Sequence, residues 1–223
     1  MVGESGSGKS TLLRSILRLI PTQKAMLTGS VFFEDRNLVE LKEKEMNSIR
    51  GRKISIIPQN SAVSLDPVYT VGKQLTETIQ MHRHTGIQEC KQLATELLNK
   101  VGLGSNIMNA HPHEMSGGMR QRAIIAMAIS SNPLVLLADE ITSGLDVIVQ
   151  DQILDLLDSL QNELGTAILL VTHDISIVAE RCKKTIVMYA GKAMETGSVR
   201  DVLKEPSHPY TMMLLRCLPD LIS

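Results

Sequence analysis

The first ten residues contain a run whose residue types and spacing suit the binding of phosphate groups. GESGSGKS, at positions 3–10, matches the pattern G-x-x-x-x-G-K-[ST] throughout. Glycines let backbone N–H groups turn towards anionic oxygens, and the helix that follows adds its positive N-terminal end. Lys9 can then reach the outer phosphates of a nucleotide, while the Ser10 hydroxyl can bind Mg²⁺. We therefore predict a nucleotide-binding loop rather than a flexible Gly/Ser linker, made of Gly3, Glu4, Ser5, Gly6, Ser7, Gly8, Lys9, Ser10 and Thr11.

Two acidic residues directly follow an apolar run. LVLLADE, at positions 134–140, places Asp139 and Glu140 at the carboxyl end of a predicted buried strand, the edge at which ligands bind in open α/β sheets. An aspartate there can hold Mg²⁺, and the next glutamate can orient or deprotonate an attacking water. Alone, the pair is better explained as two solvated acids. Together with the phosphate loop, it predicts a site for nucleotide hydrolysis.

A second loop with an affinity for anions lies in the middle of the chain. MSGGMRQR, at positions 115–122, places Ser116, Gly117 and Gly118 where a helix is expected to begin. The alternative is an N-cap serine followed by two flexible glycines. A single ATP site does not need two such loops, but two related chains packed head to tail would use both.

Helix-like and strand-like patterns alternate along the chain. Strands are expected at 29–33, 53–57, 134–138, 167–171 and 185–190, with helical patterns at 10–20, after the strand at 134–138, and repeatedly over 73–131. Strand–helix–strand alternation predicts an α/β fold with a parallel sheet. Because 73–131 lacks strand-like runs, we interpret it as an inserted α-helical subdomain.

Composition excludes several classes of protein. The 223 residues are 43% hydrophobic and 21% charged, which argues against disorder. A net charge of −1 and an aromatic content of 2% argue against a nucleic-acid binder. Cys90, Cys182 and Cys217 show no metal-binding or disulfide spacing. No apolar stretch reaches about 18 residues, and no signal peptide is expected, so any membrane role should be peripheral.

The order of these motifs resembles the nucleotide-binding subunit of ABC transporters. GESGSGKS is similar to the Walker A loop, MSGGMRQR to the signature loop and LVLLADE to Walker B. The remaining motifs are the Q-loop, the D-loop and the switch histidine, which resemble Gln59, Asp146 in SGLD and His173 in LLVTHD. The resemblance implies a P-loop NTPase (RecA-like) fold, with a core at 1–72 and 132–197 and the helical subdomain at 73–131.

The resemblance also implies cofactors, partners and residue roles. Two cassettes, identical or different, would sandwich two Mg·ATP. Ser10, Gln59 and Asp139 would hold Mg²⁺, Lys9, Glu140 and His173 would act in hydrolysis, and Ser116–Gly118 would reach the partner's ATP. Transmembrane permease subunits would bind the cassettes at the cytoplasmic face of the membrane, with an extracytoplasmic binding protein acting indirectly.

Several stretches resemble one branch of this family, the oligopeptide, dipeptide and nickel importers. They include SLDPVYTVGKQL, HPHEMSGGMRQR and, most specifically, EPSHPYTMMLL within a C-terminal tail at 198–223. The cargo, peptide or nickel, is left open by these residues. A non-transport ABC ATPase is disfavoured, because long coiled-coil insertions and a second cassette are missing from the sequence.

The sequence departs from the family pattern at several points. Ile141 replaces a proline and Gly144 an alanine, and Cys217 alone near the end predicts no iron–sulfur cluster. Family members carry further strands and an adenine-stacking aromatic before the phosphate loop, where this chain has only Met1 and Val2. We therefore expect a poorly seated loop, and an inactive truncated cassette is the alternative to an active ATPase.

Overall fold

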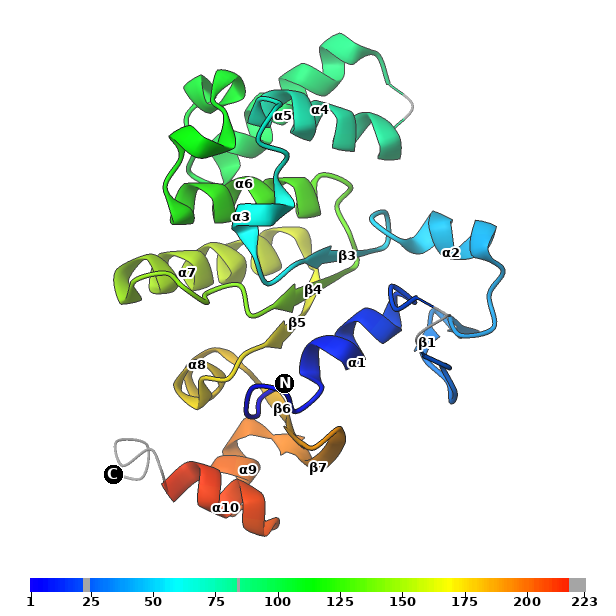
Figure 1. The fold of residues 1–223 in the computed structure, drawn as a ribbon, viewed down its shortest axis with the longest axis vertical. Coiled ribbons are helices and arrows are strands. Elements are labelled where there is room, and N and C mark those ends of the chain that lie inside the picture. Colours follow the sequence, from blue (N-terminus) through cyan, green and yellow to red (C-terminus); the bar gives the residue numbers. More distant parts are fainter. Residues whose placement is uncertain (22–24, 84, 217–223) are drawn as a thin grey trace. The chain divides into compact units, whose positions relative to one another are not determined.

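The computed structural model of the chain describes residues 1–21, 25–83 and 85–216. It contains two compact units (Figure 1). The first joins Met1–Leu41 to Leu170–Ser223, and the second is Lys42–Leu169. Cys217 lies outside the described residues.

The first unit combines the phosphate loop with the last third of the chain. Two hairpins of antiparallel strands occur in it, β1 with β2 and β6 with β7. In chain order its elements are α1 (Lys9–Ile16), β1 (Phe32–Phe33), β2 (Arg36–Asn37), α8 (Ile175–Arg181), β6 (Lys184–Tyr189), β7 (Lys192–Ser198), α9 (Val199–Lys204) and α10 (Pro209–Arg216).

Val2 lies between two other segments of this unit and pairs with both. It forms parallel bridges with Thr172 on one side and with Val187 of β6 on the other. The Val2 N–H donates to Ile186 O at 2.9 Å, and Met188 N–H donates to Val2 O at 2.8 Å. Val2 is only 2% exposed. The phosphate loop therefore starts from a buried residue that is paired on both sides, so the expectation of a poorly seated loop is wrong for this structure.

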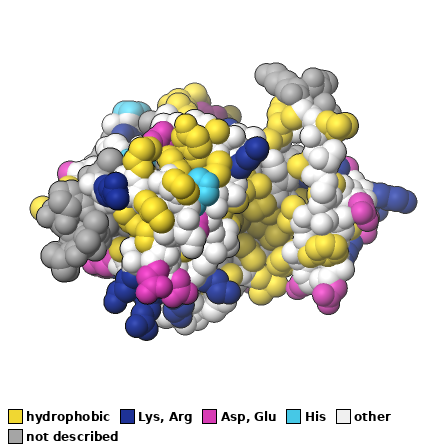
Figure 2. All heavy atoms as spheres, turned by 90° about the horizontal axis from the view of Figure 1, so that it is seen from below, with side chains coloured by type: hydrophobic (Ala, Val, Ile, Leu, Met, Phe, Trp, Pro, Cys, Tyr) yellow, Lys and Arg dark blue, Asp and Glu magenta, His cyan; other side chains and the backbone are white. Residues whose placement is uncertain are grey.

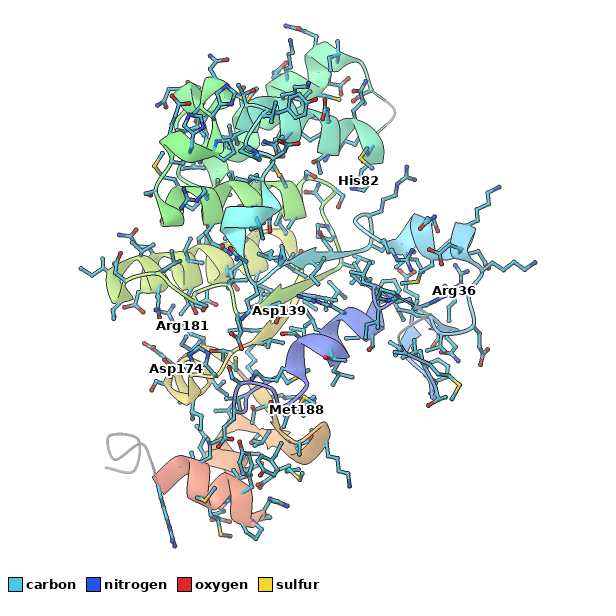
Figure 3. All side chains as sticks on the ribbon, in the orientation of Figure 1. Arg36, His82, Asp139, Asp174, Arg181 and Met188 are labelled. Atoms are coloured by element: carbon cyan, nitrogen blue, oxygen red, sulfur yellow. The ribbon has the colours of Figure 1, made fainter. Side chains whose placement is uncertain are left out.

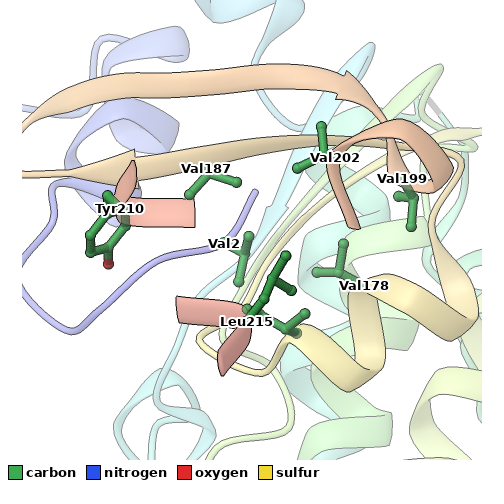
Figure 4. Packing of buried hydrophobic residues seen from close by; sticks show 8 residues of the cluster. Val2, Val178, Val187, Val199, Val202, Tyr210 and Leu215 are labelled. Carbon is green, nitrogen blue, oxygen red and sulfur yellow. The ribbon is translucent and has the colours of Figure 1, made fainter. Parts of the chain in front are cut away.

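The C-terminal helices pack onto the same strands. Val2 and Val187 share one buried cluster with Val199 and Val202 of α9 and with residues of α8 and α10 (Figure 4). On the outer side of α10, Met212 and Met213 are 39% and 57% exposed. Figure 2 views this side of the unit, where hydrophobic side chains reach the surface. The tail thus buries one face against the strand that leads into the phosphate loop.

A carboxylate on β7 fixes the start of α10. Glu195 accepts hydrogen bonds from the backbone N–H groups of Ser207 and His208, at 2.8 and 3.2 Å. Burial raises the pKa of Glu195, but these two hydrogen bonds, together with the Thr211 side chain and the charge of His208, outweigh burial, and the pKa lies below its usual value. The ionised carboxylate therefore stabilises the attachment of the tail.

The second unit contains a parallel strand pair and a group of helices. Its elements are α2 (Glu43–Ile49), β3 (Ile54–Ile57), α3 (Ser61–Ser64), α4 (Val71–His82), α5 (Ile87–Lys100), the 3₁₀ helices η1 (Ser105–Asn109) and η2 (Pro112–Glu114), α6 (Gly117–Ile129), β4 (Val135–Asp139), α7 (Val147–Leu164) and β5 (Ala167–Val171), the last two residues of which belong to the first unit.

β3 and β4 are parallel, with Ile54 opposite Val135 and Ile57 opposite Ala138. β5 completes this sheet in the order β3-β4-β5. Helices α4, α5 and α6 pack against one another, η1 packs on α4 and α5, and α6 also packs on β3. The α/β fold with a parallel sheet and a helical region is confirmed.

All five expected strands are present, although the one expected at 29–33 is only Phe32–Phe33. The strand expected at 185–190 is β6, which is parallel to Val2 but antiparallel to β7 on its other edge. Residues 85–131 and 73–83 contain helices and no strand. The predicted division into core, helical subdomain and tail at 72, 131 and 197 stays a prediction. No helix among the described residues is long and apolar enough to cross a bilayer.

The buried position of Val2 can be tested by Val2→Ala. Removing two buried carbon atoms from this cluster should lower the free energy of unfolding by about 1–3 kcal/mol. We expect a melting temperature lowered by roughly 3–10 °C, measured by circular dichroism. The matched control is Val68→Ala, at a side chain that is 71% exposed. Equal effects of both substitutions would contradict the seating described for Val2.

The Glu195 anchor predicts a pH-dependent contribution to stability. Because the native pKa of Glu195 is lowered, its contribution is fully present above the usual glutamate value of about 4.3 and is lost as the pH falls through the native value. Chemical denaturation of wild type and Glu195→Gln should therefore differ most above pH 5 and converge as the pH falls below 4.3. A difference independent of pH would show that the charge of Glu195 is not what matters.

Candidate nucleotide-binding site

The phosphate loop turns sharply between Val2 and α1. Gly6 and Gly8 have φ values of 82° and 94°, a left-handed conformation that glycine adopts without steric strain. Gly8 is the N-cap of α1, and Leu12 N–H donates to its carbonyl at 2.9 Å. Since the first N–H groups of a helix lack partners within it, they are available to an anion.

Two buried polar side chains line this turn. The Lys9 side chain donates from Nζ to Gly3 O at 2.7 Å and to Glu4 O at 2.8 Å, and Lys9 is 3% exposed. The Ser7 Oγ atom is buried and has no hydrogen-bond partner within the described part of the chain. A buried ammonium group and a buried hydroxyl beside the N-terminus of a helix fit the oxygens of phosphates, which accept hydrogen bonds from N–H and O–H groups.

The β6–β7 hairpin packs against the phosphate loop and holds it in place. A Cβ atom on Gly3 would lie 2.1 Å from Met188 O, so only glycine fits at this position. Gly191, in the turn of the hairpin, donates its N–H to Ser7 O at 3.0 Å. Sequence reasoning missed this support; its only local signal is the glycine that follows the strand expected at 185–190.

His173 lies at the same edge of the strands as the phosphate loop. It follows Thr172, which bridges Val2 in parallel, so the loop and His173 leave neighbouring strands at their carboxyl ends. The next residue, Asp174, caps α8 by accepting from Ser176 N–H at 2.7 Å (Figure 3). His173 itself is exposed, so a ligand in solvent can reach it.

In the second unit, the register of β3 and β4 places Gln59 beside Glu140. Ile57 is opposite Ala138, so the residues two positions further on leave the sheet at the same level. Gln59 Nε2 donates to Glu140 Oε2 at 2.8 Å. The amide thus orients the carboxylate predicted to act on water.

Asp139 and Glu140 differ in their backbone geometry. Asp139 ends β4 (Figure 3) and is 0% exposed, a position where a carboxylate is normally paired or bound to a cation. Glu140 is 8% exposed with a φ of 44°, which a non-glycine residue adopts at an energetic cost often found at functional sites. A buried carboxylate is a ligand of the type that Mg²⁺ prefers.

The signature loop packs against the segment that carries Asp146. Ser116 caps α6 by accepting from Met119 N–H at 3.2 Å, and Asp146 caps α7 by accepting from Val149 N–H at 3.0 Å. A Cβ atom on Gly118 would lie 2.7 Å from Val149 Cγ1. The small residues of the signature loop therefore let two helix N-termini approach closely.

The predicted site residues form three groups in the structure. The first unit holds the phosphate loop from Gly3 to Thr11 together with His173. The second unit holds Gln59 beside Glu140, next to Asp139, and separately Ser116, Gly117 and Gly118 beside the start of α7. Ile141, which replaces the usual proline, is 2% exposed and packs inside the second unit. Joint action of the three groups on nucleotide is a proposal.

Three family models match parts of the chain. Residues 1–143 match the family described as ABC transporter. Residues 194–223 match the family described as oligopeptide/dipeptide transporter, C-terminal region. A model described as AAA domain, putative AbiEii toxin, matches residues 108–179.

Individual relatives are similar over the full length of the chain. The probable peptide ABC transporter ATP-binding protein y4tR of Sinorhizobium fredii is 48% identical, covering 99% of this chain and 67% of the relative. The oligopeptide transport ATP-binding protein OppD of Bacillus subtilis is 46% identical, covering 100% of this chain and 63% of the relative. The chain thus spans about two thirds of the length of these relatives.

Solved structures agree with this assignment. A dimeric post-hydrolysis state of the ATP-binding cassette MJ0796 bound to ADP and Pi superimposes with a TM-score of 0.77 at 32% identity, covering 89% of this chain and 84% of that chain. A second dimeric structure of MJ0796 gives a TM-score of 0.76 at 33% identity. The chain belongs to the ABC transporter family and is one of its ATP-binding cassettes, an ABC ATPase.

Proposed function

We propose that this chain binds and hydrolyses ATP to energise the import of peptides. The observation that carries the proposal is the geometry of the phosphate loop, with its buried Lys9 and Ser7 beside the N-terminus of α1. The names of the relatives y4tR and OppD support peptides as cargo. Neither name mentions nickel, so the names support peptides rather than nickel as cargo.

The phosphate loop is proposed to bind the triphosphate. Its backbone amides and the Lys9 ammonium group would donate hydrogen bonds to the phosphate oxygens, and Lys9 would leave the carbonyls of Gly3 and Glu4 to do so. Ser10, Gln59 and Asp139 would hold Mg²⁺, which neutralises phosphate charge when bound. His173, at the same strand edge as the loop, would stabilise charge developing on the γ-phosphate.

Glu140 is proposed to polarise the attacking water. Its carboxylate would accept a proton as the water oxygen bonds to the γ-phosphorus and the bond to the bridging oxygen breaks, giving ADP and phosphate. The hydrogen bond from Gln59 Nε2 to Glu140 Oε2 would help to hold this carboxylate in place. Because Gln59 also belongs to the loop after β3, it can report the presence of nucleotide to the neighbouring helices.

The signature loop is proposed to serve a second cassette. Ser116, Gly117 and Gly118 are held at the N-terminus of α6, where an anion is favoured. The dimeric state of MJ0796 supports pairing of two cassettes. The second cassette is either another copy or a related chain. Val147 and Ile148, which follow Asp146, are 73% and 71% exposed. Pairing with a second cassette would cover them.

The remaining partners follow from the same proposal. Permease subunits would hold the cassettes at the cytoplasmic face of the membrane, and a binding protein outside would deliver the peptide to the permease. Residues 73–131 are proposed as the helical subdomain that takes up contact with the permease, and 198–223 as the tail of the peptide branch.

Glu140→Gln tests the catalytic assignment. The variant should bind Mg·ATP but hydrolyse it at least about 100-fold more slowly, the scale of lost general-base catalysis. Phosphate release by the purified chain measures the rate, and calorimetry measures binding. The matched control is Glu89→Gln, at an exposed glutamate on α5, which should leave both unchanged. Full turnover by Glu140→Gln would reject the role of Glu140, and absence of turnover in wild type would favour an inactive cassette.

A further inference from the structure

One side chain of the C-terminal helix α10, Tyr210, packs against the residues that hold the phosphate loop in place. This residue is 7% exposed and belongs to the buried cluster that contains Val2 (Figure 4). The phosphate loop begins at Gly3, one residue after Val2. The tail and the loop therefore share the same packed interior.

The Tyr210 ring lies against a residue that leads into the supporting turn. Its centroid is 4.5 Å from that of Tyr189, at an interplanar angle of 37°. Tyr189 ends β6, and two residues later Gly191 donates its N–H to Ser7 O of the loop. A Cβ atom on Gly8 would lie 3.4 Å from Gly191 Cα. Displacement of the Tyr210 ring would therefore be transmitted to Ser7 and Gly8.

The Tyr210 hydroxyl lies beside the loop itself. Its oxygen is buried and makes no hydrogen bond of ordinary geometry with any described residue. Burial raises the pKa of Tyr210, while the backbone N–H of Glu4 is near enough to lower it and the Glu4 carboxylate raises it again. The phenol therefore stays protonated at neutral pH, next to the residue whose carbonyl receives Lys9 Nζ.

The backbone around Tyr210 is fixed independently of the loop. The Glu195 carboxylate accepts hydrogen bonds from the N–H groups of Ser207 and His208. The Tyr210 N–H donates to His208 Nδ1 at 3.1 Å. These bonds set the first turn of α10 and hence the place of the Tyr210 side chain. A buried hydroxyl without a bond of ordinary geometry is unfavourable for stability.

We propose that Tyr210 is a positioning residue for nucleotide binding. Its ring supports the turn at Gly191, and its hydroxyl bonds the backbone at Glu4 when Lys9 leaves the carbonyls of Gly3 and Glu4 for the phosphates. The C-terminal segment is thereby part of the support of the nucleotide site. The inference rests on the proposed binding of nucleotide by the phosphate loop.

Tyr210→Phe tests the inference on the full chain, because it removes the hydroxyl and keeps the ring. We expect the dissociation constant of Mg·ATP, measured by calorimetry, to rise about 3- to 10-fold, the effect of one hydrogen bond. The melting temperature should stay equal to that of wild type or rise, since an unpaired buried hydroxyl is lost. KM should rise while kcat is kept, and affinity for Mg·GTP should fall by the same factor.

Control variants separate the possible outcomes. Tyr69→Phe, at a 42% exposed tyrosine of the second unit, should leave binding unchanged, and Tyr210→Leu should weaken binding further than Tyr210→Phe because the ring contact is also lost. If Lys9→Ala abolishes binding but Tyr210→Phe binds like wild type, the inference is wrong while the proposed function stands. If Lys9→Ala binds like wild type, the proposed function itself fails.

Discussion

The phosphate loop depends on the pairing of Val2 with the segments on both of its sides. A glycine-rich loop binds anions well only if its amides are already oriented, because ordering them at the moment of binding would lose affinity. Two hydrogen bonds to β6 and parallel bridges to Val187 and Thr172 fix the entry of the loop. The hairpin then fixes its far side through Met188 and Gly191. The same pairing places His173 at the edge where the loop begins.

In the second unit, too, parallel strand pairing brings candidate residues to the same edge of a sheet. The register of β3 and β4 places Gln59 and Glu140 side by side, so that a hydrogen bond between two loops follows from strand pairing. Glu140 follows the end of β4 with a φ of 44°, a backbone conformation that costs energy and is often found at functional sites. Packing of Gly118 against Val149 joins the signature loop to the segment of Asp146. Each group of candidate residues is thus held by regular elements rather than by long loops.

Much of the fold could be predicted from local patterns. The apolar runs at 134–138 and 167–171 became β4 and β5, because buried parallel strands are continuously apolar. Strand β7 could not be predicted, since none of the residues of KAMETGS is buried and the sequence shows no alternation of apolar and polar residues. Its pairing with β6 has no local signal in the sequence. The shortness of Met1–Val2 predicts a poorly held phosphate loop, and this prediction is wrong. Pairing of Val2 with Thr172 and Val187 decides how the loop is held, and those partners lie 170 and 185 residues further along the chain. The contact of Tyr210 with Tyr189 is equally non-local.

Amide hydrogen exchange would test the seating of the phosphate loop most directly. The N–H groups of Thr172 and Met188 donate to Met1 O and Val2 O, so their protection reports only on this pairing. The account predicts that both exchange slowly in the free chain, and that amides of residues 5–9 become slower when Mg·ATP is added. Rapid exchange at Thr172 and Met188, with no response of the loop to Mg·ATP, would contradict it.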